Sequence, residues 1–226
     1  SVKRITDNIQ ENADEEFYRI ATTFAYSRTV PSLVSYPGLS TFSSSLERST
    51  MDHFALMGDL GVNAATEYTN GTPITDALYG VRYYMTVKDF DPKEIEANPE
   101  KMYFHRFTNR FDLERYYTEK VYEDKRFLVY KNPNSFPLGY GTNALVKNIK
   151  FGVNNAIANQ NIILNSMEGH QKKTSDYYDY FKPLAFSAIE TENVIEEKVD
   201  KNTGEAIYKR ADSSKEAIIR YKLVPR

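Results

Sequence analysis

The chain has 226 residues, of which 41% are hydrophobic and 27% charged, and a formal net charge of -2. This composition supports a sizeable core and excludes a disordered polymer. The slightly acidic charge argues against a nucleic-acid binder, which needs a basic surface to displace phosphate counterions. The absence of cysteine excludes disulfides and thiolate metal sites.

Aromatic residues are unusually distributed, with 18 Tyr and 13 Phe but no Trp. Tyrosine combines an apolar face with a hydroxyl, so these residues suit either a surface for sugars and polar polymers or half-buried strands. No apolar run approaches the ~20 residues that span a bilayer, and the first residues lack the apolar core of a signal peptide.

The predicted elements of the first half alternate between helices and strands. Residues 1–17 indicate a polar helix or a loose lead-in, and residues 17–24 (FYRIATTF) a strand, because they are rich in β-branched and aromatic residues. Residues 30–38 (VPSLVSYPG) are predicted to be a loop. Residues 43–58 follow as a helix that Gly58 or Gly61 ends. An Asn-Gly turn at 70–71 then precedes a strand at 81–87.

In the second half, residues 91–99 predict a short helix between two prolines, and residues 103–125 have no clean period. Residues 126–143 indicate a strand, a turn and an extended segment. Residues 151–169 predict a helix with a broad apolar face, ended by Gly169. After Pro183 the apolar residues recur at every second position, as in a β-strand. This pattern predicts a hairpin at 194–210 with NTGE at its tip, and a further strand at 216–223.

These elements together predict an α+β fold, in which a mixed or antiparallel sheet with flanking helices is followed by the first strands of a β appendage. We place the α+β domain at residues 1–171 and the β-hairpin, as the start of a β-sandwich, at residues 172–222. The final LVPR matches the left half of a thrombin site. We therefore interpret residues 223–226 as an expression scar on a segment cut from a longer protein.

Local motifs for chemistry are missing from the sequence. His53, His105 and His170 show no metal-ligand spacing, and no nucleophile elbow, P-loop or dinucleotide fingerprint is present. The acidic runs ENADEE and ETENVIEE suit either a glycosidase acid/base pair or solvated faces. Lys172 and Lys173, beside three tyrosines, suit an anionic polymer or a solvated loop. We predict no catalytic residue, no metal site and no cofactor.

Five stretches, in their order along the chain, carry a family resemblance. They are FYR, YPGLSTFSS, LYGVRYYM, VYKNPNSFPLGYG and NNAIANQNIILNSMEG. Over residues 17–169 the chain thereby resembles the extracytoplasmic region of bacterial YfhO-type membrane proteins, in which a β-sandwich usually follows.

The resemblance implies a part of a polytopic glycosyltransferase of the GT-C type. Such enzymes transfer a sugar from an undecaprenyl-phosphate carrier to a cell-wall polymer such as lipoteichoic acid, outside the plasma membrane. The family's catalytic acidic residues lie between early membrane spans, so the chain is expected to be a non-catalytic accessory domain. Its implied partners are the membrane-embedded remainder of the same polypeptide and a lipid-linked sugar or anionic polymer. The alternatives are a free-standing envelope polymer-binding module and a protein-interaction scaffold.

A turn rich in hydroxyl groups is the candidate substrate-binding site. It lies between Tyr36 and the predicted helix, where the N-terminal N–H groups of a helix favour an anion. The residues predicted to bind substrate are Arg28, Tyr36, Ser40, Thr41, Ser43, Ser44 and Arg48. The alternative is that Ser43 or Ser44 only caps the helix while Gly38 serves the turn, and that Arg48 only pairs with a neighbouring acid.

The helix at 151–169 also carries amides that are costly to bury unless every donor and acceptor is paired. We predict that its apolar residues face inward. We also predict a structural role for Gln160 and Asn161, at least one of which should anchor a neighbouring loop through its backbone.

Overall fold

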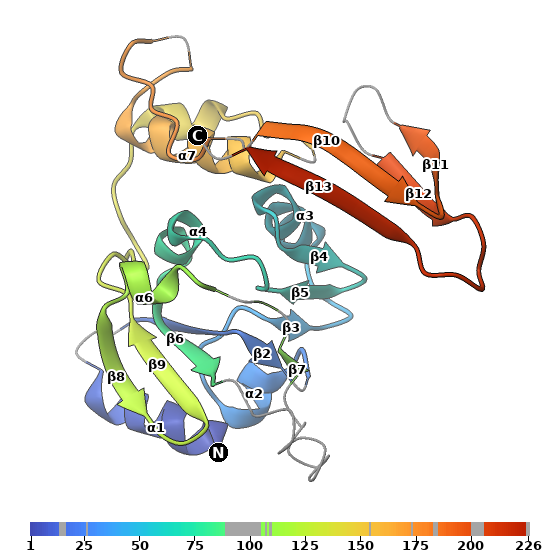
Figure 1. The fold of residues 1–226 in the computed structure, drawn as a ribbon. Helices are drawn as coiled ribbons and strands as arrows, with labels where there is room; N and C mark the ends of the chain where they lie inside the picture. Colours follow the sequence, from blue (N-terminus) through green and yellow to red (C-terminus); the bar gives the residue numbers. More distant parts are fainter. Residues whose placement is uncertain are drawn as a thin grey trace.

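A four-stranded mixed sheet forms the centre of the first half of the chain in the computed structural model (Figure 1). Its order is β1 (Arg19–Thr22), β6 (Val81–Val87), β9 (Phe127–Lys131) and β8 (Glu119–Glu123). β1 and β6 are parallel, and the other pairs are antiparallel. The structure describes residues 1–13, 17–25, 27–88, 105–106, 108, 110–153, 155–172, 174–182, 185–199 and 206–224. The predicted α+β class is confirmed.

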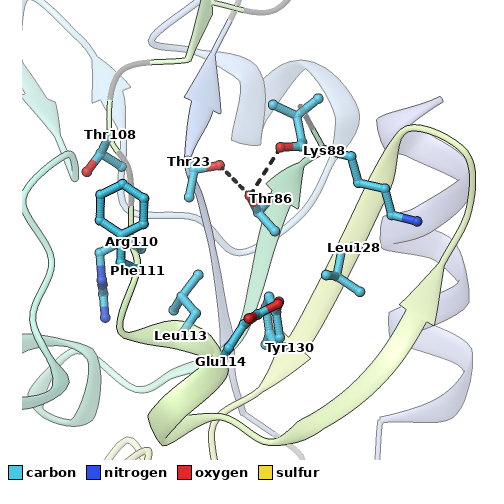
Figure 2. Close-up of a pocket in the computed structure, with 11 residues that line it drawn as sticks. Thr23, Thr86, Lys88, Thr108, Arg110, Phe111, Leu113, Glu114, Leu128 and Tyr130 are labelled. Atoms are coloured by element: carbon cyan, nitrogen blue, oxygen red, sulfur yellow. Dashed lines mark hydrogen bonds between the residues drawn. The ribbon is translucent and has the colours of Figure 1, made fainter. Parts of the chain in front are cut away.

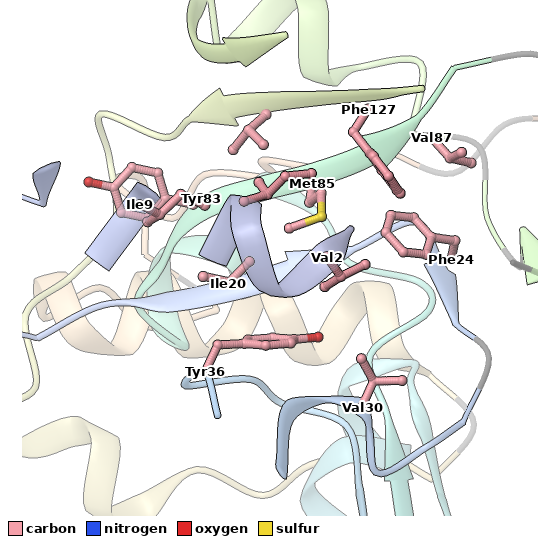
Figure 3. Close-up of a cluster of buried hydrophobic side chains, with 12 residues drawn as sticks. Val2, Ile9, Ile20, Phe24, Val30, Tyr36, Tyr83, Met85, Val87 and Phe127 are labelled. Carbon is pink, nitrogen blue, oxygen red and sulfur yellow. The ribbon is translucent and has the colours of Figure 1, made fainter. Parts of the chain in front are cut away.

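One face of this sheet is covered by α1 (Val2–Asn12) and α2 (Val30–Val34). Side chains alternate along a strand, so Tyr83 and Met85 of β6 point to this face. Val2, Ile5 and Ile9 of α1 have helical spacing and join them in one buried cluster (Figure 3). The predicted loop at 30–38 is wrong in its first part, because a proline at the first turn of α2 suits a helix start.

The opposite face is covered by three helices and a small antiparallel sheet. The helices are α3 (Arg48–Met57), α4 (Pro73–Leu78) and α6 (Leu113–Tyr116). The sheet has the order β3 (Thr41–Phe42), β5 (Ala65–Glu67), β4 (Leu60–Val62), and β2 (Phe24–Ala25) pairs separately with β7 (His105–Arg106). α3 begins at Arg48, later than predicted, and Gly58 ends it with a φ of 102° that favours glycine.

The long helix α7 (Ala156–Glu168) buries its amides and leaves its apolar residues partly exposed. The predicted inward apolar face is therefore wrong: Ile157 is 44% exposed, whereas Gln160 is 1% exposed. The buried residues are Asn159, Gln160, Asn161 and Asn165. α7 lies against α3, α4 and the 3₁₀ helix η2 (Ala144–Asn148).

Each buried amide of α7 anchors the backbone of another segment, as predicted for Gln160 and Asn161. Gln160 Nε2 donates to the carbonyl of Met57 at 2.8 Å, and its Oε1 accepts from the Thr72 hydroxyl at 2.6 Å. Asn161 both donates to and accepts from the backbone of Phe181, at 2.8 and 2.9 Å. These hydrogen bonds offset the free energy that is needed to desolvate the amides.

The C-terminal strands form two antiparallel ribbons that extend away from the rest of the chain (Figure 1). β10 (Ala185–Glu192) pairs with β13 (Ile218–Val224), and β11 (Val194–Val199) pairs with β12 (Ala206–Arg210). The predicted hairpin is thus confirmed in its pairing, while its NTGE tip and the predicted helix at 91–99 lie outside the described residues. β13 includes two of the four residues interpreted as a scar; the scar and the domain boundaries stay predictions.

Replacing Gln160 with leucine should destabilise the chain by about 1–3 kcal/mol, because the Met57 carbonyl and the Thr72 hydroxyl lose a buried partner. Chemical denaturation measures this free energy of unfolding. Gln171→Leu, the same change at an exposed position, is the control and should have little effect. Equal stabilities of the two variants would contradict the anchoring role.

Candidate binding site

The predicted loop at residues 36–48 places most of its polar groups in contacts within the protein. Tyr36 is buried in the core below the sheet. The Ser40 hydroxyl accepts from the backbone N–H of Tyr68 at 3.2 Å, and the Ser43 hydroxyl accepts from the N–H of Ser45 at 3.3 Å. Thr41 is paired in β3, and Ser44 is exposed. Ser43 and Ser44 do not cap α3, whose N-cap residue is Glu47.

The two arginines predicted for this loop face carboxylates. Arg28 lies 3.5 Å from Glu67, and Arg48 lies 3.5 Å from Asp52 on the surface of α3. Gly38 has a packing reason, because a Cβ there would meet the Pro31 ring at 2.4 Å. Anion binding at this loop stays a prediction.

A different cleft, between the inner strands β6 and β9 and the segment that enters α6 (Leu113–Tyr116), brings hydroxyl groups together from distant segments (Figure 2). Its volume is about 330 Å³. Thr23, which follows β1, donates a hydrogen bond to Thr86 of β6 at 3.0 Å. Across from them the Tyr130 hydroxyl of β9 donates to Glu114 of α6 at 3.0 Å. The remaining lining residues are Val87, Lys88, Thr108, Arg110, Phe111, Leu113 and Leu128.

Burial and the neighbouring Glu114 carboxylate raise the pKa of Tyr130 to about 12. The Tyr130 hydroxyl therefore keeps its proton at neutral pH and acts as a donor. Glu114 is exposed and presents acceptor oxygens to the opening. The cleft thus offers both donors and acceptors around an apolar floor that contains Leu113 and Leu128.

A buried ionic hub, made by Asp76, Arg110, Tyr68 and Tyr117, fixes one wall of the cleft. The Asp76 side chain is 0% exposed, and it receives Arg110 Nη2 at 2.7 Å and the Tyr68 hydroxyl at 2.6 Å. The Tyr117 hydroxyl donates to Asp76 Oδ2, the carboxylate oxygen that Arg110 Nη2 also contacts. Burial, and then the Asp76 charge, raise the pKa of Tyr68 well above its ordinary value, so this tyrosine remains a donor.

Arg110 holds the hub to the strand behind it and to the segment that enters α6. Its guanidinium makes two 2.7 Å contacts with Asp112 and lies 4.8 Å from the ring centroid of Tyr84. Gly71 lets this packing occur, because a Cβ there would come within 2.8 Å of Arg110 Nη1 and 2.7 Å of the Tyr68 ring. Burial alone would lower the pKa of Arg110, but the hydrogen bonds that Arg110 donates to Asp112 and the charge of Asp76 raise it.

No pattern in the sequence indicates this cleft or the ionic hub beside it. Thr23, Asp76 and Tyr130 lie in three separate segments, and Arg110 lies in the region that has no clean period. A threonine or a tyrosine in a strand pattern is ordinary. Only the pairing of β1, β6 and β9 brings these side chains to one place.

A second buried carboxylate, Asp59, follows α3 and accepts from the backbone N–H groups of Thr69 and Asn70 at 2.9 and 2.8 Å. Within the described part of the chain its other oxygen has no hydrogen-bond partner. Burial, opposed by these two bonds, raises the pKa of Asp59 to about 6. The group is therefore a source of pH-dependent stability.

The family model for the bacterial membrane protein YfhO matches residues 1–225. The chain belongs to this family. Comparisons with curated proteins and with solved structures gave no match. Across the described ranges of this YfhO-family chain, no helix has the length and apolar character to cross a membrane. The same ranges bring together no group of three or more His, Asp or Glu side chains that could hold a metal ion.

Several stretches that carry the YfhO resemblance meet at a larger cleft, of about 710 Å³, which Phe17, Arg82 and residues 135–139 line. Arg19 Nη1 donates to the Tyr79 carbonyl at 2.6 Å, and Arg82 Nη1 to the Asn132 carbonyl at 3.0 Å. Gly80, whose φ is 65°, lies close to the Phe136 carbonyl. The FYR, LYGVRYYM and VYKNPNSFPLGYG stretches therefore contact one another in the fold.

Replacing Asp76 with asparagine should destabilise the chain by about 3–5 kcal/mol, because Arg110 would lose part of its charge compensation in a buried site. Asp52→Asn is the matched control, since that carboxylate is in an exposed pair with Arg48, and it should cost less than about 1 kcal/mol. Urea denaturation at neutral pH compares them. A small, equal loss in both variants would show that the hub does not hold this fold.

The free energy of unfolding should depend on pH through Asp59. Its pKa is raised from 3.8 to about 6, so the folded chain binds this proton more tightly than the unfolded chain. The contribution of Asp59 to the free energy of unfolding is therefore greatest below about pH 4. It falls by about 3 kcal/mol in total as the pH rises to about 6, and it is constant above that pH.

Asp59→Asn should remove that step, because a side-chain amide does not titrate in this pH range. The asparagine carbonyl oxygen can still accept from the N–H groups of Thr69 and Asn70, so the local structure is kept. Stability curves from pH 4 to pH 7.5 measure the difference between the variant and the unaltered chain. Asp52→Asn should keep the step. Parallel curves for Asp59→Asn and the unaltered chain would contradict the assignment.

Proposed function

We propose that this chain is the extracytoplasmic, non-catalytic part of a membrane glycosyltransferase. The parent enzyme would transfer a sugar from an undecaprenyl-phosphate carrier to a cell-wall polymer such as lipoteichoic acid. The observation that carries the proposal is the match of a membrane-protein family over residues 1–225. Such a segment, in which the described helices are too short or polar to span a bilayer, fits a part that stands beside the membrane.

The contacts of Asp76 and Asp112 support a structural and non-catalytic role for these two carboxylates. Asp76 is closed off by donors from Arg110, Tyr68 and Tyr117. Asp112 is held by the same arginine. A glycosyl-transfer base needs an accessible carboxylate within reach of the acceptor hydroxyl, and these two carboxylates are instead used to hold the fold. The proposed partners are the membrane-embedded remainder of the polypeptide and a sugar-bearing lipid or polymer.

Topology is tested by cysteine labelling, for which this chain is well suited because it contains no cysteine. In the full-length parent, freed of cysteines elsewhere, Ser44→Cys and Val153→Cys place single thiols at exposed positions. A membrane-impermeant maleimide should label both in intact cells. Val129→Cys, at a fully buried position, should label only after denaturation. Labelling at 44 and 153 that requires cell lysis would place the chain on the cytoplasmic side and end the proposal.

The isolated chain should show no sugar transfer and no hydrolysis of a lipid-phosphate sugar. Mass spectrometry of the products, with the full-length parent as the positive control, provides the measurement. Turnover by the isolated chain that is lost on mutating one of its own residues would show that catalysis resides here.

A further inference from the structure

The charged groups that line the hydroxyl cleft are already compensated within the protein. Lys88 lies 2.6 Å from Glu123, and the buried Arg110 is held between Asp76 and Asp112. Glu114 adds a negative charge at the opening. Among the described lining residues, an anionic ligand would meet this carboxylate without an uncompensated cation, so they favour a neutral ligand.

The polar groups that face the cleft are spaced around it and differ in character. Figure 2 shows Thr23 and Thr86 on one part of the lining and Glu114 with Tyr130 on another. Hydroxyl groups both donate and accept, whereas an ionised carboxylate only accepts. Such a mixed set matches a ligand with several hydroxyl groups, each of which is also both donor and acceptor.

An exposed aromatic residue stands at the same opening. Phe111 is 88% exposed although it lies two residues before the buried Leu113, and it is one of the residues that line the cleft (Figure 2). A single exposed phenylalanine needs no explanation by itself. Here it adds an apolar face to a lining of hydroxyls, and a pyranose ring has both a C–H face and hydroxyl edges.

We propose that this cleft binds one neutral hexose residue, with Phe111 against the C–H face of the ring and Glu114 and Thr86 on its hydroxyl groups, while the buried Thr23 holds the Thr86 hydroxyl in place. The volume of about 330 Å³ is at the lower end of the range of small-molecule sites, about 300–1,000 Å³, and suits a single ring. This inference rests on the proposed function for its ligand class, and it gives that function a binding site on the chain itself.

The experiment uses Phe111→Trp as a reporter, since the chain has no other tryptophan. The purified chain is titrated with the methyl glycosides of glucose, galactose and N-acetylglucosamine, and separately with inorganic phosphate. At least one glycoside should change the indole emission saturably at millimolar concentration. Glu114→Gln in the same background should weaken this binding about 3- to 10-fold, because it removes the charged acceptor. The control Glu47→Gln changes an exposed glutamate outside the cleft and should leave binding unaltered.

Calorimetry with the unaltered chain and with Phe111→Ala gives a second measurement that does not depend on the reporter. Loss of sugar binding in Phe111→Ala, with retention in the surface variant Phe42→Ala, supports the site. No saturation with any of the three glycosides, binding that neither Glu114→Gln nor Phe111→Ala weakens, or tighter binding of phosphate at the cleft would each overturn it. Cysteine labelling at positions 44 and 153, outside the cleft, reports on topology independently of this result.

Discussion

The buried ion pair between Asp76 and Arg110 connects the tyrosine-rich cluster on one face of the central sheet. It joins α4, which precedes the central strand β6, to the segment that leads into α6, which covers the same face of the sheet. A desolvated ion pair contributes to stability only when its hydrogen bonds are complete. Here Tyr68, Tyr117 and Asp112 complete them, and the ring of Tyr84 lies against the guanidinium.

The hub also explains why a binding cleft can exist beside it. Arg110 and Leu113 belong to the cleft lining, and the contacts of Arg110 hold this segment against β6. A site whose walls are fixed by buried side chains loses little conformational entropy when a ligand binds. Thr86 and Tyr130 lie on strands, so two of the polar groups are held by the sheet itself. The proposed sugar site therefore rests on rigid elements, whereas the loop at residues 36–48 directs most of its polar groups into the fold.

The buried amides of α7 also hold separate segments together through polar contacts. Asn159, Asn161 and Asn165 bind backbone groups of segments that have little regular structure of their own, and Gln160 binds the carbonyl of the last residue of α3. Side-chain amides both donate and accept, so each of these three asparagines binds both the N–H and the C=O of one residue, as a strand partner would. The chain thereby keeps long connections ordered without enlarging its apolar core.

By itself the sequence determined the features that depend on local periodicity and on single backbone conformations. The strand Val81–Val87, the helix ends at Gly58 and Gly169 and the pairing of the C-terminal hairpin follow from alternation and from glycine's tolerance of positive φ. The order of short stretches likewise indicated the YfhO family, which the family match confirmed. The inward apolar face of α7 was predicted wrongly, because the partners that satisfy its amides are distant in the chain. The helical turn at Pro31 was missed, although a proline at that position suits the start of a helix. Asp76, Arg110 and the cleft residues gave no signal at all. Their chemistry arises when segments more than thirty residues apart exclude water together, and only the tertiary structure decides that.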